Sequence, residues 1–237
     1  MKQTLSILLM TACCAVSANA QTQVKSGDKI AFLGDSITQQ GNQAPAGYIH
    51  LVMDGLREAG ILAEAVPAGI SGHKSNDMLA RLDRDVIAKN PQWMTLSCGV
   101  NDVWHFVFGP GRGVSLEDFK ANITQIVDKA QAAGIHVVIL TATMVTEDAS
   151  ASKNITLAGY NDFLRKLAAE RKLPLTDLNA DMQALVAQKP AGSGNLLTRD
   201  GVHMNLSGNI MMAKGILRTF GVSEDVLTKC EARWKTL

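Results

Sequence analysis

The stretch KIAFLGDSITQQG, residues 29–41, begins as a short apolar run and then turns sharply at Gly34, Asp35 and Ser36. A short, mostly apolar run such as 29–33 is typical of a strand that is buried on both faces. Because glycine, aspartate and serine are common turn residues, one interpretation is a plain turn. The other is a nucleophilic serine presented at the mouth of a sheet, and the rest of the chain decides between the two.

Four further apolar runs have the same character, and they cover residues 62–66, 93–98, 137–142 and 173–178. None alternates cleanly between apolar and polar residues, which indicates strands of a parallel sheet with both faces covered. Helical patterns lie between and after these runs, at about 48–56, 78–87, 115–134, 155–171, 206–220 and 223–234. This alternation predicts right-handed βαβ units, and hence an α/β fold with three layers, α/β/α.

Residues 1–20, MKQTLSILLMTACCAVSANA, have the pattern of an export signal, with Lys2 before a short apolar core and a small-x-small cleavage site at 18–20. The apolar core is too short to span a bilayer. Cleavage after Ala20 would leave one domain over residues 21–237, periplasmic or secreted. Met10-Thr11-Ala12-Cys13 also resembles a bacterial lipobox, so a lipid anchor on Cys13 is the alternative, and an uncleaved N-terminus is a third.

The charge of the chain argues against partners of strong charge. The full sequence has 23 basic and 22 acidic residues, and the signal contains Lys2 but no acid, so the mature chain is neutral. We therefore expect neither nucleic acid nor an anionic membrane surface as a partner, whereas a homo-oligomer is compatible with the sequence. Cys98 and Cys230 are the cysteines left after removal of the signal. Because Cys98 ends an apolar run, we expect it to be a buried free thiol, with pairing to Cys230 as the alternative.

Ligands of open parallel sheets bind beyond the carboxyl ends of the strands, so the residues that follow each predicted strand are informative. The first strand is followed by Gly34-Asp35-Ser36, the second by AGISGHKS (68–75) and the third by GVND (99–102). RDGVHMN, residues 199–205, lies in a loop before a late helix. A serine, a glycine turn, an amide and an acid–base pair therefore converge on one edge.

These residue types fit acyl transfer. His203 can remove the proton of Ser36, and Asp200 can hold the far ring nitrogen and stabilise the imidazolium. The backbone N–H groups of Ser36 and Gly72 and the side-chain amide of Asn101 can supply three donors to an oxyanion. Each motif by itself is more often a turn or a helix cap, but their agreement in position and order favours a catalytic site.

Four of these blocks, GDSIT, GISG, GVND and DGVH, resemble the motifs of the SGNH hydrolases, also called GDSL esterases, over a whole domain from Gly34 to His203. The resemblance implies a flavodoxin-like α/β/α sandwich with a five-stranded parallel sheet. By position it implies that Ser36 is the nucleophile, that Gly72 and Asn101 are oxyanion donors, and that Asp200 and His203 are the acid–base pair. The reaction needs no metal and no cofactor.

The region from GISGHKS to GVNDVW is similar to the branch that contains bacterial acetylxylan esterases, which implies an acetylated carbohydrate as substrate. Alternatives are a lysophospholipase, arylesterase or thioesterase for longer acyl chains, and a carbohydrate-binding protein with a lapsed site. Pro67 and His73 depart from that branch beside the site, and Met204 replaces a common proline, which leaves the substrate open. Asp35, His73 and Trp104 are the expected substrate contacts.

Trp104, Phe106 and Phe108 alternate just beyond Asn101. They form either a packed loop or a wall for a sugar ring or an acyl group. No pair among the histidines other than His203 has the i, i+4 spacing of a helical zinc site, so a metal centre is not expected.

Overall fold

A computed structural model describes residues 23–109, 111–190 and 192–237. The export signal and the lipobox predicted within residues 1–20 lie outside these ranges. Five parallel strands form one sheet in the order β2-β1-β3-β4-β5. The strands are β1 (Lys29–Gly34), β2 (Glu64–Gly69), β3 (Trp93–Ser97), β4 (His136–Leu140) and β5 (Leu175–Thr176).

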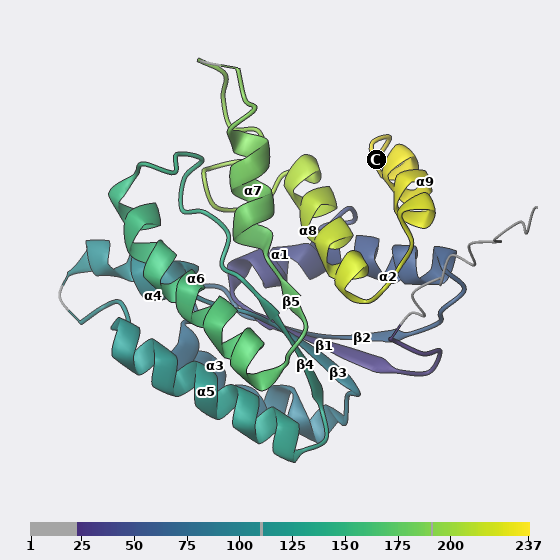
Figure 1. The fold of residues 1–237 in the computed structure, drawn as a ribbon, viewed down its shortest axis with the longest axis horizontal. Coiled ribbons are helices and arrows are strands. Elements are labelled where there is room, and N and C mark those ends of the chain that lie inside the picture. The colour runs from purple at the N-terminus through teal and green to yellow at the C-terminus, as the bar shows by residue number, and fades with distance from the viewer. Residues whose placement is uncertain (1–22, 110, 191) are drawn as a thin grey trace, which may run out of the picture.

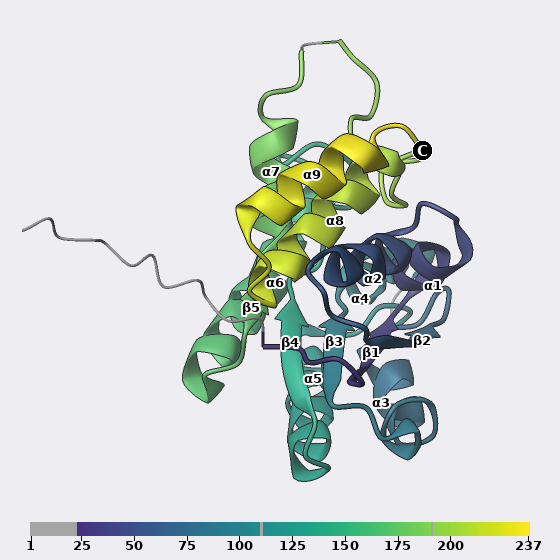
Figure 2. The ribbon, with the colours of Figure 1, turned by 90° about the vertical axis from the view of Figure 1, so that its right-hand side faces the viewer.

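Helices cover both faces of this sheet, as Figures 1 and 2 show. One layer holds α1 (Ser36–Gln43), α2 (Tyr48–Glu58), α7 (Leu178–Val186), α8 (Leu206–Thr219) and α9 (Glu224–Trp234). The other holds α3 (Ser75–Asp85) and α5 (Leu116–Ala132), with α6 (Ser152–Arg171) packed against α5 and β4. Three short helices, η1 (Ile87–Lys89), α4 (Val100–Trp104) and η2 (His105–Phe108), complete the described chain. The predicted three-layer α/β/α sandwich with five parallel strands is therefore confirmed.

The two edge strands differ most from their predicted limits. The strand predicted at 62–66 begins at Glu64, which pairs with Lys29, and it contains Pro67. Because β2 is an edge strand, the missing N–H of proline costs it no ladder bond. At the other edge, β5 has only two residues, since Asp177 ends it by capping α7: its side chain accepts a hydrogen bond from the N–H of Ala180.

Glycine is required at position 34, just before the Asp35–Ser36 turn, for a steric reason. A Cβ atom on Gly34 would lie 2.0 Å from Oγ1 of Thr38, and one on Gly69 would lie 2.3 Å from the backbone nitrogen of Gln39. The two glycines therefore let α1 pack directly on the ends of β1 and β2. Tyr48 holds the same hydroxyl group in place, because its own hydroxyl donates to Oγ1 of Thr38 at 3.0 Å.

Cys98 is a buried free thiol, as the sequence predicted, and Cys230 is one as well. Within the described ranges, we find no helix with the length and apolar character that a membrane crossing requires.

Candidate active site

The structure brings Ser36, His203 and Asp200 into one hydrogen-bonded chain at the carboxyl edge of the sheet. Oγ of Ser36 lies 2.9 Å from Nε2 of His203, and Nδ1 of His203 lies 2.6 Å from Oδ2 of Asp200. Ser36 is the first residue of α1, and Asp35 caps that helix by accepting a hydrogen bond from the N–H of Ile37 at 2.9 Å. The sharp turn therefore places a hydroxyl group within reach of a base, as the spacing of motifs predicted.

Asp200 holds both the imidazole ring and the backbone of its own loop. Its Oδ1 accepts hydrogen bonds from the N–H groups of Val202 and His203, at 3.0 and 2.8 Å. Burial alone would raise the pKa of Asp200, but these bonds and the one from the His203 ring outweigh burial and lower the pKa to about 2. A carboxylate that stays charged in this way fixes the ring orientation and stabilises an imidazolium.

Three candidate oxyanion donors lie at the ends of neighbouring strands. Within the described ranges, no acceptor is bonded to the backbone N–H groups of Ser36 and Gly72. Gly72 has a φ of +77°, a conformation that favours glycine, in the turn after β2. Nδ2 of Asn101 donates to the carbonyl of His73 at 3.1 Å, which fixes the amide and leaves its second N–H for a ligand.

A buried arginine that the sequence analysis did not single out ties the ends of two strands together. Arg81, on α3, is 4% exposed and donates to the carbonyls of Gly34 and Ala68 at 2.9 and 2.8 Å. Its Nε donates to Nδ1 of His73 at 3.0 Å. A single guanidinium thus contacts three places: the carbonyl of Gly34 at the end of β1, the carbonyl of Ala68 in β2, and His73 in the turn that carries Gly72.

The same guanidinium sets the state of His73. Because an arginine N–H can only donate, Nδ1 of His73 must accept, so the hydrogen of the neutral ring sits on Nε2. Burial and the charge of Arg81 lower the pKa of His73, which keeps the ring neutral. The side chain is half-buried beside the oxyanion donors, and its role as a substrate contact stays a prediction.

A second buried charge holds the loop that carries Asp200 and His203. The carboxylate of Glu147 accepts hydrogen bonds from the N–H groups of Leu196, Leu197 and Thr198, and from the hydroxyl of Thr198, at 2.5–2.8 Å. Burial would raise the pKa of Glu147, but these four bonds lower it. The segment between β4 and α6, which contains Glu147, therefore anchors the acid–base loop.

Asp35 has a structural role that the sequence analysis did not assign to it. The residue is 2% exposed and its side chain caps α1, while contact of Asp35 with a substrate stays a prediction. Burial, with a further contribution from the nearby carboxylate of Asp102, raises the pKa of Asp35 to about 6. Asp102 itself is buried and accepts hydrogen bonds from the N–H and hydroxyl groups of Ser75 at 3.0 and 2.6 Å.

The aromatic residues beyond Asn101 divide into two groups. Trp104 is half-buried at the end of α4, with Nζ of Lys153 6.0 Å from its ring centroid. Phe106 and Phe108 are 40% and 64% exposed, so this part of the segment is not a fully packed loop. Contact of Trp104 with a substrate stays a prediction.

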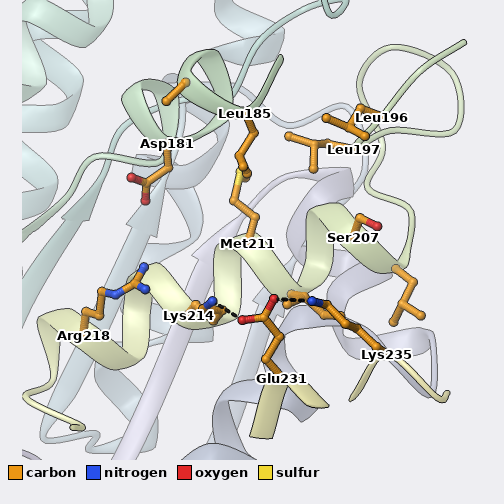
Figure 3. Close-up of a pocket in the computed structure, with 13 residues that line it drawn as sticks. Asp181, Leu185, Leu196, Leu197, Ser207, Met211, Lys214, Arg218, Glu231 and Lys235 are labelled. Carbon is orange, nitrogen blue, oxygen red and sulfur yellow. Dashed lines mark hydrogen bonds and ion pairs between the residues drawn. The ribbon is translucent and has the colours of Figure 1, made fainter. Parts of the chain in front are cut away.

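A cavity of about 550 Å³ lies between α7, α8 and α9, and neither Ser36 nor His203 lines it. Figure 3 shows the residues that do. Its wall is apolar around Leu185 and Met211, and its rim is charged. Glu231 pairs with both Lys214 and Lys235 along this rim. Because no histidine lines the cavity, it offers no candidate base for Ser36-type chemistry, and we do not assign the reaction to it.

The GDSL-like Lipase/Acylhydrolase family model matches residues 32–209, which include all five predicted catalytic and oxyanion residues. The chain belongs to this family. It is therefore a carboxylic ester hydrolase, and the resemblance to SGNH hydrolases is confirmed.

The chain is also similar to known acetylxylan esterases. It is 28% identical over 217 residues to the acetylxylan esterase of Geobacillus stearothermophilus. The aligned region covers 84% of this chain and 96% of the relative. The crystal structure of Axe2, an acetylxylan esterase of that organism, matches with a TM-score of 0.77 at 25% identity, over 85% of this chain and 97% of that one. The acetyl xylan esterase AlAXEase matches with a TM-score of 0.74 at 35% identity, over 80% and 98%. These likenesses confirm the predicted branch of the family and its fold.

Proposed function

We propose that the chain removes O-acetyl groups from carbohydrate, through an acetyl-enzyme on Ser36. The observation that carries this proposal is the hydrogen-bonded chain from Ser36 through His203 to Asp200, with Gly72 and Asn101 beside it. This arrangement combines an activated nucleophile with oxyanion donors, which are the two requirements of acyl transfer.

In the first half-reaction, Oγ of Ser36 attacks the acetyl carbonyl carbon while Nε2 of His203 takes the hydroxyl proton. The oxyanion that forms accepts hydrogen bonds from the N–H groups of Ser36 and Gly72 and from Nδ2 of Asn101. The C–O bond to the sugar then breaks, and His203 returns its proton to the leaving sugar oxygen. Asp200 stabilises the imidazolium between these two transfers.

In the second half-reaction, water attacks the acetyl-enzyme. His203 takes a proton from that water, and the same donors hold the second oxyanion. The bond from the acetyl carbon to Oγ then breaks, Ser36 regains its proton from His203, and acetate leaves. Every proton therefore passes through Nε2 of His203, and no co-reactant other than water is consumed.

The relatives support both the residues and the substrate class. Mutants of Axe2 described as catalytic replace a serine, an aspartate and a histidine by alanine, and that aspartate lies three residues before the histidine. Asp200 and His203 have the same spacing. Because the relatives are acetylxylan esterases, an acetylated xylan-like polysaccharide or oligosaccharide is the substrate that we infer. The export signal predicted over residues 1–20 is consistent with a polymeric substrate outside the cell.

One observation favours a second candidate, the hydrolysis of longer acyl esters. Phe106 and Phe108 expose apolar rings a few residues beyond Asn101, where an acyl chain longer than acetyl could bury them. In the preferred account, this surface instead faces the sugar.

The proposal is tested by acetate release from acetylated xylo-oligosaccharides, together with kcat/KM for nitrophenyl esters from acetyl to octanoyl. We expect acetate release and the highest kcat/KM with the acetyl ester. An octanoyl optimum with no acetate release would promote the second candidate, and inactivity on every ester would favour a lapsed site.

A further inference from the structure

A cavity of about 320 Å³ borders the reacting pair on the side of the acid–base loop. Ile37, the neighbour of Ser36, and Met204, the neighbour of His203, both line it. Gln40 of α1 and Arg199 of the loop lie in the same wall. Because His203 must reach the oxygen of the leaving sugar, a cavity beside its loop is placed to receive the alcohol part of the substrate.

Arg199 is held close to the nucleophile by its backbone and by its side chain. Its N–H donates to the carbonyl of His203 at 2.8 Å, and its guanidinium donates to Oε1 of Gln40. Gln40 follows Ser36 by four residues on α1, so it lies on the same face of the helix, about 6 Å along the axis. The guanidinium is therefore held against the helix that presents Ser36, one turn further along that helix.

This guanidinium has unused capacity for an anion. Among the described residues, six of the other eight arginines pair with an Asp or Glu side chain, whereas Arg57 and Arg112, like Arg199, have no such pair; the six are Arg81, Arg84, Arg165, Arg171, Arg218 and Arg233. Over the same described ranges, Asp and Glu side chains are absent from the cavity wall, and the one carboxylate there is the terminal group of Leu237, which forms no ion pair with Arg199. The carboxylate of Asp200 is engaged by His203 and Val202. Several N–H donors of the planar fork of Arg199 remain for a ligand.

Axe2 differs from this chain at the corresponding place. One solved mutant of Axe2 replaces a tryptophan by isoleucine, and that tryptophan directly precedes the aspartate that a catalytic mutant replaces. In this chain, Arg199 directly precedes Asp200. The position just before the aspartate thus holds an uncharged tryptophan in that relative and the cationic Arg199 in this chain.

We propose that the cavity beside Arg199 binds a carboxylate on the leaving group, so that the preferred substrate is an acetylated oligosaccharide that carries a uronic acid. The inference rests on the proposed function. One guanidinium without a second cation in the wall matches a single planar carboxylate, with which it can form two parallel hydrogen bonds. Arg199 would then select the substrate by the charge of its sugar part and not by its acetyl group.

The test uses two substrates that differ in one group: an acetylated xylo-oligosaccharide with a glucuronic acid branch, and the same compound with that carboxyl reduced to an alcohol. We expect the wild-type kcat/KM to be about fivefold higher for the acid, the effect of one partly exposed charge pair of ~1 kcal/mol. The ratio should fall toward one in Arg199→Gln, and also at high salt. Arg57→Gln is the matched control. Arg57 is an exposed arginine near Gly27, at the amino ends of the strands and so away from the site, and this variant should keep the wild-type ratio.

Equal wild-type kcat/KM for the two oligosaccharides would overturn this inference and leave the proposed function standing. An unchanged acid preference in Arg199→Gln would overturn it as well, because another group would then hold the carboxylate. Nitrophenyl acetate hydrolysis without acetate release from either oligosaccharide would instead overturn the proposed function, and this inference with it.

Discussion

Glu147→Gln removes the charge that anchors the acid–base loop while keeping the shape of the side chain. The side chain is 1% exposed, and one carboxylate oxygen accepts three hydrogen bonds while the other accepts the N–H of Leu196. Glutamine can keep the group of three, but its NH₂ then faces the N–H of Leu196. Loss of that bond and of the charge on the others should lower the free energy of unfolding by roughly 2–3 kcal/mol.

For a chain of this size, such a loss corresponds to a decrease in Tm of about 4–12 °C. Because Thr198 lies two residues before Asp200, we also expect kcat to fall about tenfold, with a smaller change in KM, as the loop loses its fixed position. Thermal unfolding and nitrophenyl acetate kinetics, well below the Tm of the variant, measure the two effects. Glu117→Gln is the matched control, since Glu117 is 85% exposed and its replacement should change stability by less than about 0.5 kcal/mol.

The same substitution has a signature in the pH dependence of stability. The folded protein lowers the pKa of Glu147, so its contribution is fully present above the unfolded-state pKa of about 4.3 and is lost as the pH falls through the lower folded-state pKa. The stability difference between wild type and Glu147→Gln should therefore shrink in acid. A Tm within 1 °C of wild type together with an unchanged kcat would refute the anchoring role.

Three further substitutions test the rest of the site. Asn101→Ala should lower kcat by about 10²–10³ with a smaller change in KM, and normal activity with reduced thermal stability would instead indicate a structural turn. Asp200→Asn should lower kcat by up to about 10⁴, the size of effect seen when this change is made in a serine protease triad, and near-normal rates would argue against an Asp–His pair. Arg81→Lys keeps the charge but loses the planar guanidinium with its several N–H donors, so kcat should fall about 10- to 100-fold, and Arg81→Met should be no more active. Equal kcat in Arg81→Lys and wild type would contradict a positioning role for Arg81.

Local patterns were sufficient for most of the fold. The limits of β1, β3 and β4 lie within one or two residues of the predicted runs, because buried strands are continuous apolar segments. The helix predicted at about 115–134 is α5, and Ser115 caps it by accepting a hydrogen bond from the N–H of Asp118. By contrast, α1 was missed, because SITQQGNQ is almost entirely polar and its packing depends on the absence of side chains at Gly34 and Gly69.

The candidate site was predictable to the extent that its groups follow strands. Ser36, Gly72 and Asn101 follow β1, β2 and β3 along the chain, so topology alone brings them to one edge. The two buried charges that position this edge were not predictable in that way. Arg81 contacts a carbonyl 47 residues away, and Glu147 contacts N–H groups about 50 residues away. In the sequence, both resemble ordinary charged surface residues.

The most direct test of the account is the identity of the residue that carries the acetyl group. The wild-type enzyme is treated with a serine-directed phosphonate, and the adduct is located by peptide mass spectrometry, in parallel with Ser36→Ala. We expect one adduct, on Ser36, and no adduct or ester hydrolysis in the variant, which should retain its fold because alanine removes only the Oγ atom that bonds to His203. An adduct on another serine, or ester hydrolysis by Ser36→Ala at the wild-type rate, would contradict the assignment of the nucleophile and the mechanism built on it.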